Sequence, residues 1–590
     1  MESRTKISLR KKVAFSLASV LIFFTLLEIS LKSWGIDPVL QTEDPFVGFS
    51  GSVPLYVNDT GTPGMMVTAA NKRSHFNLQQ FQRTKPANTF RIFCLGGSTT
   101  YGRPFDDATS FAGWLREFLP VADPKRSWEV LNAGGVSYAS YRIVSLVEEL
   151  IQYQPDLFVI YTGHNEFLES RSYPELANMS PWLLKSAATA GRFRTFALLR
   201  KLIATPAQAP SQQYQMPGEV DEILNHTIGP SSYQRDDAKR AQVAKHFEFN
   251  LIRMVQLARA GGAKVLIVSP ASNLKDCAPF KSQHRDGLST DEKQRFDALL
   301  KQAHANQAEE KLELALTQYK QAMAIDNRYA NLHYQVAQLL LKKQQITEAL
   351  LASRRAQEED ICPLRALESI RDSIQRVAAD MNVPLVDFHH LLAEQCQQEH
   401  RHRLPGQEYF LDHVHLRPEI HRQLAIHLVD AMIQNSFIQT EQHWRNRNLA
   451  DIDQQVYGRV DEVGQATALR NLAKVLNWAG KHLEAGALAL EALETTPNDA
   501  EALLLAAPYL KTLGRLDQAA RYYQQALHQL PDHAEAHQLL GALMAEQGDY
   551  QEAKKHFLEY LRIHPDDKQA PLRVAILCTR LKQFRESLPY

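Results

Sequence analysis

Residues 91–100, RIFCLGGSTT, join a short apolar run to two glycines, a serine and two threonines. An apolar run that ends in this way is typical of a buried strand that turns sharply into a helix. Four further runs resemble it: 128–131, 156–161, 264–268 and 383–386. Longer segments with helical spacing separate them. Strands that are apolar throughout are buried on both faces, so this alternation predicts an α/β domain with a doubly wound parallel sheet.

Short polar motifs occur along the same region in a set order. LGGSTT (95–100), NAGGVSY (132–138) and YTGHNE (161–166) each follow one of the first three predicted strands, and DHVH (412–415) precedes a predicted helix. In an open α/β sheet the reactive site lies beyond the carboxyl ends of the strands. We therefore expect all four motifs at one edge of the sheet.

Ser98, Asp412 and His415 are the residue types that acyl transfer needs. A serine hydroxyl is a poor nucleophile at neutral pH and requires an adjacent base. Histidine can take that proton and return it to the leaving group, while a carboxylate fixes the tautomer of the imidazole. The tetrahedral oxyanion needs donors that are already in place. The backbone N–H of Ser98 and the side-chain amide of Asn165 are candidates for this role.

The four motifs resemble the four sequence blocks of the SGNH (GDSL-like) hydrolases, over roughly residues 87–435. This resemblance implies a flavodoxin-like sheet and a serine hydrolase that acts on ester bonds. It further implies Ser98 as the nucleophile, Asn165 as an oxyanion donor, and Asp412 and His415 as the acid and base of the triad. Ester-linked acyl groups, for example on a glycan or a lipid, are the substrates that it suggests.

The sequence departs from the family pattern in three places. Gly97 and Thr99 stand where G-D-S-L has Asp and Leu, and the third block reads G-H-N-E instead of G-x-N-D. In the second block, Ser137 replaces the usual glycine. The backbone N–H of Ser137 can still serve the oxyanion, but Gly134 or Gly135 could supply it in a shifted turn. The sequence leaves this donor open.

Two alternatives compete with the hydrolase interpretation. The DHVH motif could hold a metal, since two histidines two positions apart can share a ligand sphere. No third ligand follows at a recognisable spacing, so we expect neither a metal nor another cofactor. The second alternative is an envelope scaffold whose hydrolase domain is inactive, or which transfers the acyl group to another acceptor, because transfer shares the acyl-enzyme step.

A long uncharged segment lies near the N-terminus. Residues 13–27 hold no charged side chain, and the apolar pattern continues past Glu28 to Leu31. About nineteen helical residues span roughly 28 Å, close to the hydrocarbon thickness of a bilayer. Several cations precede the segment and only Lys32 directly follows it, which favours a cytoplasmic N-terminus. Residues 1–34 are therefore predicted to form a single-pass anchor, with the bulk of the chain exported (periplasmic if bacterial). A cleaved signal peptide is the alternative, although no Ala-x-Ala type site follows.

The C-terminal region, 465–590, repeats with a period of 34 residues. The positions that share this period are Gly480, Gly514 and Gly548; Ala485, Ala519 and Ala553; and Pro497, Pro531 and Pro565. The period, the small residues and the proline after the second helix resemble the tetratricopeptide repeat. Such repeats stack into a surface for a protein partner.

Two regions remain between these parts. Residues 35–88, rich in Gly, Pro, Asn and Thr, predict an irregular linker or collar before a hydrolase domain at 89–440. Within that domain, 290–358 is rich in Ala, Gln, Leu and Lys and carries two pairs of alanines 34 apart. This pattern predicts a tetratricopeptide-like insertion, with an ordinary helical hairpin as the alternative.

Charge and cysteine content limit the partners. Lys+Arg and Asp+Glu both count 66, so no basic excess favours a nucleic-acid partner. Five cysteines in 590 residues do not form a disulfide scaffold. Cys277 and Cys362 flank the predicted insertion, and a disulfide between them is expected to hold its base together, with two separate buried thiols as the alternative.

Overall fold

The structure is a computed structural model. It describes residues 8–36, 38, 53–168, 189–203, 233–439, 444–446 and 449–583. The first seven residues, most of the first half of the expected linker and the last seven residues lie outside this part. The chain divides into two compact units, with the boundary between Asp453 and Gln454. Each unit is described by itself.

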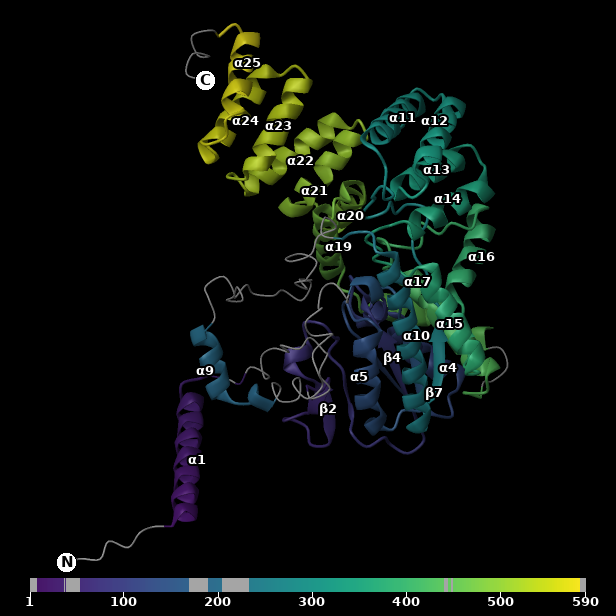
Figure 1. Ribbon diagram of the computed structural model, residues 1–590, viewed down its shortest axis with the longest axis vertical. Coiled ribbons are helices and arrows are strands. Elements are labelled where there is room, and N and C mark those ends of the chain that lie inside the picture. Colours follow the sequence, from purple (N-terminus) through teal and green to yellow (C-terminus); the bar gives the residue numbers. More distant parts are fainter. Residues whose placement is uncertain are drawn as a thin grey trace, which may run out of the picture. The chain divides into compact units, whose positions relative to one another are not determined.

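The first unit contains a five-stranded parallel sheet (Figure 1). Its strands are β4 (Thr89–Gly96), β5 (Ser127–Gly134), β6 (Leu157–Tyr161), β7 (Lys264–Val268) and β8 (Leu385–Val386). Their order in the sheet is β5-β4-β6-β7-β8, and every neighbouring pair is parallel. The prediction of a mixed α/β domain with a parallel sheet is confirmed.

Helices cover the sheet. On one side lie α5 (Ser140–Leu150), α10 (Asp237–Ala260) and α15 (Glu368–Asp380), of which α10 contacts both others. The helices α4 (Phe111–Ala122) and α17 (Pro418–Gln434) pack on each other and on β5 and β8. A further helix, α16 (Phe388–His400), directly follows β8.

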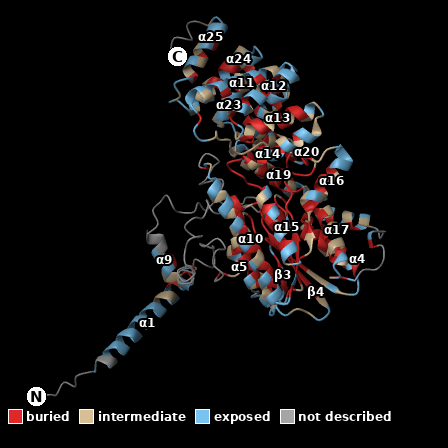
Figure 2. Cartoon of the chain, turned by 45° about the vertical axis from the view of Figure 1, so that its right-hand side comes forward, coloured by how far each residue is buried: buried red, intermediate tan, exposed pale blue. Residues whose placement is uncertain are grey.

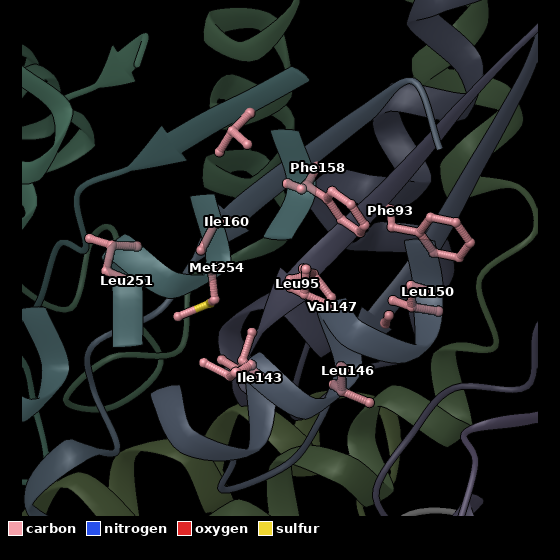
Figure 3. Packing of buried hydrophobic residues seen from close by; sticks show 14 of the residues in the cluster. Phe93, Leu95, Ile143, Leu146, Val147, Leu150, Phe158, Ile160, Leu251 and Met254 are labelled. Atoms are coloured by element: carbon pink, nitrogen blue, oxygen red, sulfur yellow. The ribbon is translucent and has the colours of Figure 1, made fainter. Parts of the chain in front are cut away.

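The largest core lies between the sheet and the α5 and α10 side (Figure 3). Alternate residues of each strand face it, because successive side chains of a strand point to opposite faces. They include Phe93 and Leu95 of β4 and Phe158 and Ile160 of β6, which are buried against helical residues such as Met254. Full burial of each such side chain stabilises the fold by about 1.5–3 kcal/mol.

Residues 53–88, expected as part of an irregular linker, form a small antiparallel sheet instead. Its strands are β1 (Tyr56–Asn58), β2 (Met65–Thr68) and β3 (Gln80–Gln82). Tyr56 and Phe81 join the main core, where their rings meet edge to face. The carboxylate of Glu149 on α5 accepts hydrogen bonds from the backbone N–H groups of Leu55 and Tyr56. This segment is therefore a packed layer of the domain.

The expected helical insertion lies between β7 and α15. It forms α11 (Thr290–Ala308), α12 (Leu312–Ile325), α13 (Ala330–Lys342) and α14 (Ile346–Glu358). These helices enclose a core of their own. The spaced alanines at 315, 322 and 349 belong to it, and small side chains at these points allow the helices to approach closely.

The expected disulfide at the base of the insertion is wrong. All five cysteines lie in the described residues and are buried thiols, and the Cys277 S–H donates to the carbonyl oxygen of Ala278. Another group holds the base together. The buried carboxylate of Asp360 accepts hydrogen bonds from the backbone N–H groups of Phe280, Lys281 and Cys362. We call this arrangement the neck of the insertion.

The second unit is a stack of helices. They are α19 (Glu462–Trp478), α20 (His482–Thr495), α21 (Ala500–Thr512), α22 (Leu516–Gln529), α23 (Ala534–Glu546), α24 (Tyr550–Ile563) and α25 (Ala570–Arg580). Gly480, Gly514 and Gly548 stand between the two helices of each pair with φ of 78°, 73° and 85°. Glycine adopts this left-handed conformation without a Cβ clash. The same turn occurs once in each repeat, and therefore glycine recurs every 34 residues. The C-terminal region is thus helical and tetratricopeptide-like.

The N-terminal helix α1 (Leu9–Ser33) is exposed along most of its length (Figure 2). Its segment Lys11–Ser33 is long and apolar enough to cross a membrane, and none of its most apolar window is buried. A signal sequence near an N-terminus has the same properties. A further short helix, α9 (Arg194–Ile203), contacts α1.

Candidate active site

Ser98, His415 and Asp412 form a continuous hydrogen-bonded chain. Ser98 is the first residue of the short helix α3 (Ser98–Tyr101), which follows β4 directly. The Nε2 atom of His415 lies 2.8 Å from Ser98 Oγ, and its Nδ1 atom lies 2.6 Å from Asp412 Oδ2. His415 and Asp412 are only 8% and 4% exposed, respectively. The fold therefore brings Ser98 into contact with His415, which lies 317 positions later in the sequence.

The three-residue spacing between Asp412 and His415 has a local cause. Asp412 Oδ1 accepts hydrogen bonds from the backbone N–H groups of Val414 and His415, at 2.8 and 2.7 Å. This tight turn leaves Oδ2 directed at the imidazole. With fewer or more residues between Asp412 and His415, one carboxylate could not bond both the backbone of the turn and the imidazole.

The environment of Asp412 favours its charged form. Burial by itself would raise the pKa of this carboxyl, but the imidazoles of His415 and His413 outweigh burial and hold the pKa well below its ordinary value. The Nδ1 atom of His413 lies 3.3 Å from Asp412 Oδ2. The carboxylate is thus ionised at neutral pH and can orient the His415 ring.

Asn273, which sequence reasoning missed, holds this loop in place. Its backbone N–H donates to the carbonyl oxygen of His413 at 3.0 Å, and its side-chain amide donates to that of Asp412 at 3.1 Å. Asn273 follows β7 in the chain, so these bonds attach the Asp412–His415 turn to the edge of the sheet. A lone asparagine in a loop gives no sequence signal for this role.

The side chain of Asn165 lies beside the peptide that precedes Ser98. Its Nδ2 atom donates to the Tyr138 carbonyl oxygen at 3.0 Å, and a Cβ added to Gly97 would stand 2.5 Å from the same nitrogen. A glycine is therefore required at position 97 for this close approach. An amide nitrogen carries two hydrogens, so the bond to Tyr138 uses only one of them.

The backbone N–H groups of Gly134, Gly135 and Ser137 differ in whether they already have an acceptor within the protein. The N–H of Gly135 donates to the Gly96 carbonyl oxygen at 3.0 Å, and the N–H of Gly134 donates to Asn132 Oδ1 at 3.0 Å. Both groups are engaged within the protein, which argues against the candidate Gly135. Among the contacts of the described residues, the Ser137 N–H has no such acceptor.

Ser137 adopts a conformation that glycine adopts more readily. Its φ is 61°, in the left-handed region. The guanidinium of Arg142 donates to the Ser137 carbonyl oxygen and lies over the Tyr138 ring, 4.0 Å from the centroid. These contacts hold the turn open at a backbone cost of roughly 1–2 kcal/mol.

Two further polar residues connect the motifs. Asn132 donates from Nδ2 to the Thr100 carbonyl oxygen at 2.9 Å and to Asp107 Oδ1 at 2.6 Å, which fixes the helix that begins at Ser98. Glu166 accepts from the backbone N–H and the hydroxyl of Ser140 at 2.9 and 2.7 Å. The four motifs thus form one bonded assembly.

His164 is held neutral. Burial lowers its pKa to about 3, and its Nδ1 atom accepts a hydrogen bond from the Ala366 backbone N–H at 3.2 Å. The ring therefore takes no part in proton transfer near neutral pH. Its place beside Asn165 in the third motif is structural.

Among the described residues, one cluster brings together side chains of the kinds that bind metals. The ligand atoms of Cys396, His402 and Glu408 lie within 4.8 Å of one another. The Lys275 ammonium already lies 2.8 Å from Glu408, and burial raises the pKa of the Cys396 thiol to about 12. Both observations disfavour a metal ion, which would need the thiolate. The two nitrogens of His415 are likewise engaged by Asp412 and Ser98.

If Asn165 is an oxyanion donor, as the sequence predicts, its replacement by alanine is expected to lower kcat on a model ester by about 10²–10³, because one such donor contributes roughly 3–4 kcal/mol to transition-state stabilisation. KM should change little, since the interaction forms only in the transition state. Steady-state kinetics with p-nitrophenyl acetate measure both constants. The exposed Asn58→Ala is the matched control and should keep wild-type turnover. A normal kcat in Asn165→Ala would exclude this residue from the oxyanion site.

Comparison with known proteins identifies one family. Residues 504–568 match the family described as tetratricopeptide repeat. These repeats indicate protein–protein interaction. A comparison with curated proteins found no match.

Three solved structures show limited likeness to the chain. A crystal structure of MamA protein is 18% identical, with 25% of this chain and 82% of that one covered, at a TM-score of 0.20. YrrB, a TPR protein with an unusual peptide-binding site, is 16% identical over 46% and 88% of the two chains, at 0.17. The acetyl xylan esterase AlAXEase is 13% identical over 58% and 100%, at 0.28. At these TM-scores, none of the three establishes a shared fold.

Proposed function

We propose that this protein is a membrane-anchored serine esterase of the SGNH type, which acts on ester-linked acyl groups on the exported side of the membrane. The observation that carries the proposal is the chain of hydrogen bonds from Ser98 through His415 to Asp412, at 2.8 and 2.6 Å. A buried, ionised carboxylate, an imidazole and a serine hydroxyl at the start of a helix are the parts that acyl transfer needs.

The fold supports the assignment to the SGNH type. In chain order the strands are arranged 2-1-3-4-5, which is the order of the flavodoxin-like doubly wound sheet. The motifs that contain Ser98, Ser137 and Asn165 all follow the carboxyl ends of strands, where ligands bind in such sheets. The domain limits proposed from the sequence are 89–440 for the hydrolase, with the insertion at 290–358, and 465–590 for the repeats.

The proposed reaction follows from the geometry. His415 Nε2 takes the proton from Ser98 Oγ as Oγ forms a bond to the acyl carbon. The carbonyl oxygen becomes an oxyanion that accepts from the Asn165 amide and from the backbone N–H groups of Ser98 and Ser137. His415 then protonates the departing alkoxide, which leaves an acyl-serine. Water, or a second alcohol in the case of acyl transfer, attacks with His415 as the base and releases the acyl group.

Labelling by a fluorophosphonate tests the proposal, because the probe reacts only with an activated serine. The full chain should be labelled at Ser98, and the labelled residue is identified by mass spectrometry of the peptides. Ser98→Ala should abolish labelling, while replacement of the distant, exposed Ser289 by alanine should leave it unchanged. A folded wild-type protein that takes up no label would refute the proposal and favour an inactive scaffold.

Membrane attachment belongs to the same proposal. The helix α1 supports it through the length and apolar character of Lys11–Ser33. A cytoplasmic N-terminus and an exported hydrolase follow from the cations that precede the span. The repeat unit would then bind a protein partner on the exported side.

Ending the chain after Gly458, just beyond α18 (Leu449–Tyr457), should leave a folded hydrolase with at least about half of its model-ester activity. The expectation rests on the unit boundary between Asp453 and Gln454 and on the position of all four motifs before residue 416. Contacts within a helical stack are mainly between neighbouring repeats, so their loss does not reach the sheet. Activity and thermal unfolding of the shortened protein provide the measurement. A folded but inactive product would mean that the repeats help to form the active site.

A further inference from the structure

A carboxylate of α1, the candidate membrane span, accepts hydrogen bonds from the first residues of another helix, α9. The carboxylate of Glu28 accepts three hydrogen bonds: from the backbone N–H groups of Arg194 and Thr195, at 3.0 and 2.8 Å, and from the Thr195 hydroxyl, at 2.8 Å. These groups open α9 (Arg194–Ile203), whose first N–H groups have no partner within their own helix. Glu28 thus caps a helix that begins 166 residues later in the chain.

The contact between α1 and α9 extends beyond the cap. Leu31 of α1, one turn after Glu28, is buried, as is Ala197 in the first turn of α9. Figure 1 shows α9 at the C-terminal end of α1. A charged group within an apolar span is costly unless it is paired or near the surface, and the cap gives Glu28 both partners and a structural role.

The position of Glu28 sets the depth of α9. Ser33, the last residue of α1, lies five positions after Glu28, which corresponds to about 7–8 Å along the helix axis. If α1 spans a bilayer, this is the depth of the boundary between acyl chains and headgroups. Trp34 follows immediately and is exposed. Tryptophan is enriched at this boundary because its ring is apolar and its N–H is polar.

The composition and exposure of α9 suit the same boundary. Its sequence, RTFALLRKLI, contains three basic residues and no acidic one. Phe193, Phe196 and Leu199, spaced three residues apart, are 50%, 36% and 55% exposed. Residues at this spacing lie on one face of a helix. Exposed aromatic and aliphatic side chains together with basic residues are typical of a helix that lies in the plane of a membrane surface.

We propose that α9 lies on the bilayer surface where α1 leaves it, with Phe193, Phe196 and Leu199 inserted among the lipids. This inference rests on the proposed membrane attachment through α1. The partner is a lipid surface that contains anionic headgroups, because the helix and the residues before it are basic. The hydrolase domain is then connected to the membrane at two points of its chain instead of one.

Fluorophore depth measurements on the full chain test the proposal. All five native cysteines are buried, so a bimane label attaches to one introduced cysteine. The protein is placed in vesicles of phosphatidylethanolamine with a minority of phosphatidylglycerol. Quenching by a doxyl group near the glycerol end of the acyl chains is compared with quenching by aqueous iodide. Phe196→Cys and Leu199→Cys report on α9, Phe24→Cys on the span, and Lys301→Cys on the water phase.

Labels at positions 196 and 199 should be quenched several-fold more by the lipid probe than the label at 301, and should be shielded from iodide. Adding Glu28→Ala to Phe196→Cys should remove at least half of that lipid quenching while the label at position 24 keeps its own. If iodide reached the labels at 196 and 199 as readily as the label at 301 while position 24 stayed in lipid, the placement of α9 would be wrong. The membrane attachment through α1 would still stand. Iodide access at position 24 as well would instead refute the membrane attachment on which it rests.

Discussion

Replacing Ser98 by alanine is expected to reduce kcat on p-nitrophenyl acetate by about 10⁴ or more, and His415→Ala should cost a similar factor. The alanine variant lacks the attacking oxygen, and the histidine variant lacks the base 2.8 Å from it. Because the two residues act on one proton, the double variant should be scarcely worse than either single one. Turnover by the three purified full-length variants is the measurement.

Asp412→Asn should retain more activity than either alanine variant, because the base and nucleophile remain. Ser289→Ala serves as the control, since that hydroxyl caps the distant helix α11. Wild-type turnover in Ser98→Ala would refute the proposed mechanism. Additive losses in the double variant would show that Ser98 and His415 do not share one proton transfer.

Replacing Gly96 by alanine is expected to destabilise the first unit by about 4 kcal/mol or more, in the range of severe packing errors. An added Cβ would stand 2.0 Å from the Tyr161 carbonyl oxygen and 2.1 Å from Thr100 Oγ1. Neither contact can be relieved without separating β4 from β6 or displacing the helix that begins at Ser98. Hydrogen exchange of peptides from β4 and β6 should accelerate by roughly 10³, as 1.4 kcal/mol corresponds to tenfold.

Gly61→Ala is the matched control, because its Cβ would meet only Asp59 Oδ1 at 3.6 Å, an ordinary contact. Its effect should stay within about 0.5 kcal/mol. Unchanged exchange in Gly96→Ala would mean that the strands can move apart at this point, and that the close approach of β4 and β6 is not a requirement of the fold.

The parts of the fold that could be predicted from sequence are those with a repeating or continuous signal. Apolar runs located the five strands, although β8 is only Leu385–Val386 and β4 begins earlier, at Thr89. The period of 34 located the C-terminal helices, since each Gly at that spacing has a positive φ. The small sheet of β1–β3 was missed because its strands are short. One of its core residues, Phe81, stands between two glutamines, and Tyr56 lies in an apolar run of only three residues, Leu55–Val57.

For the candidate site, sequence motifs indicated which residues meet but not how each is held. The D-x-x-H spacing reflects a local turn and could be read directly. Asn273 acts across 139 residues on Asp412, and no local pattern reveals such a contact. The choice between Gly135 and Ser137 depends on which backbone N–H already has an acceptor in the folded chain, and the sequence carries no signal for such a bond. The expected disulfide was wrong because Asp360 closes the neck with hydrogen bonds instead.

The neck also allows the inserted helices to change in evolution independently of the rest of the domain. The backbone enters and leaves the inserted helices side by side, with the Ile361 N–H donating to the Lys281 carbonyl oxygen at 2.9 Å. Because these ends are joined, the number of residues between them can change without altering the distance from β7 to the Asp412 turn. Evolution can therefore lengthen, shorten or replace α11–α14 as a cassette. Insertions between β7 and Asn273 have no such freedom, since they would move Asn273 away from the Asp412 and His413 carbonyl oxygens that it binds.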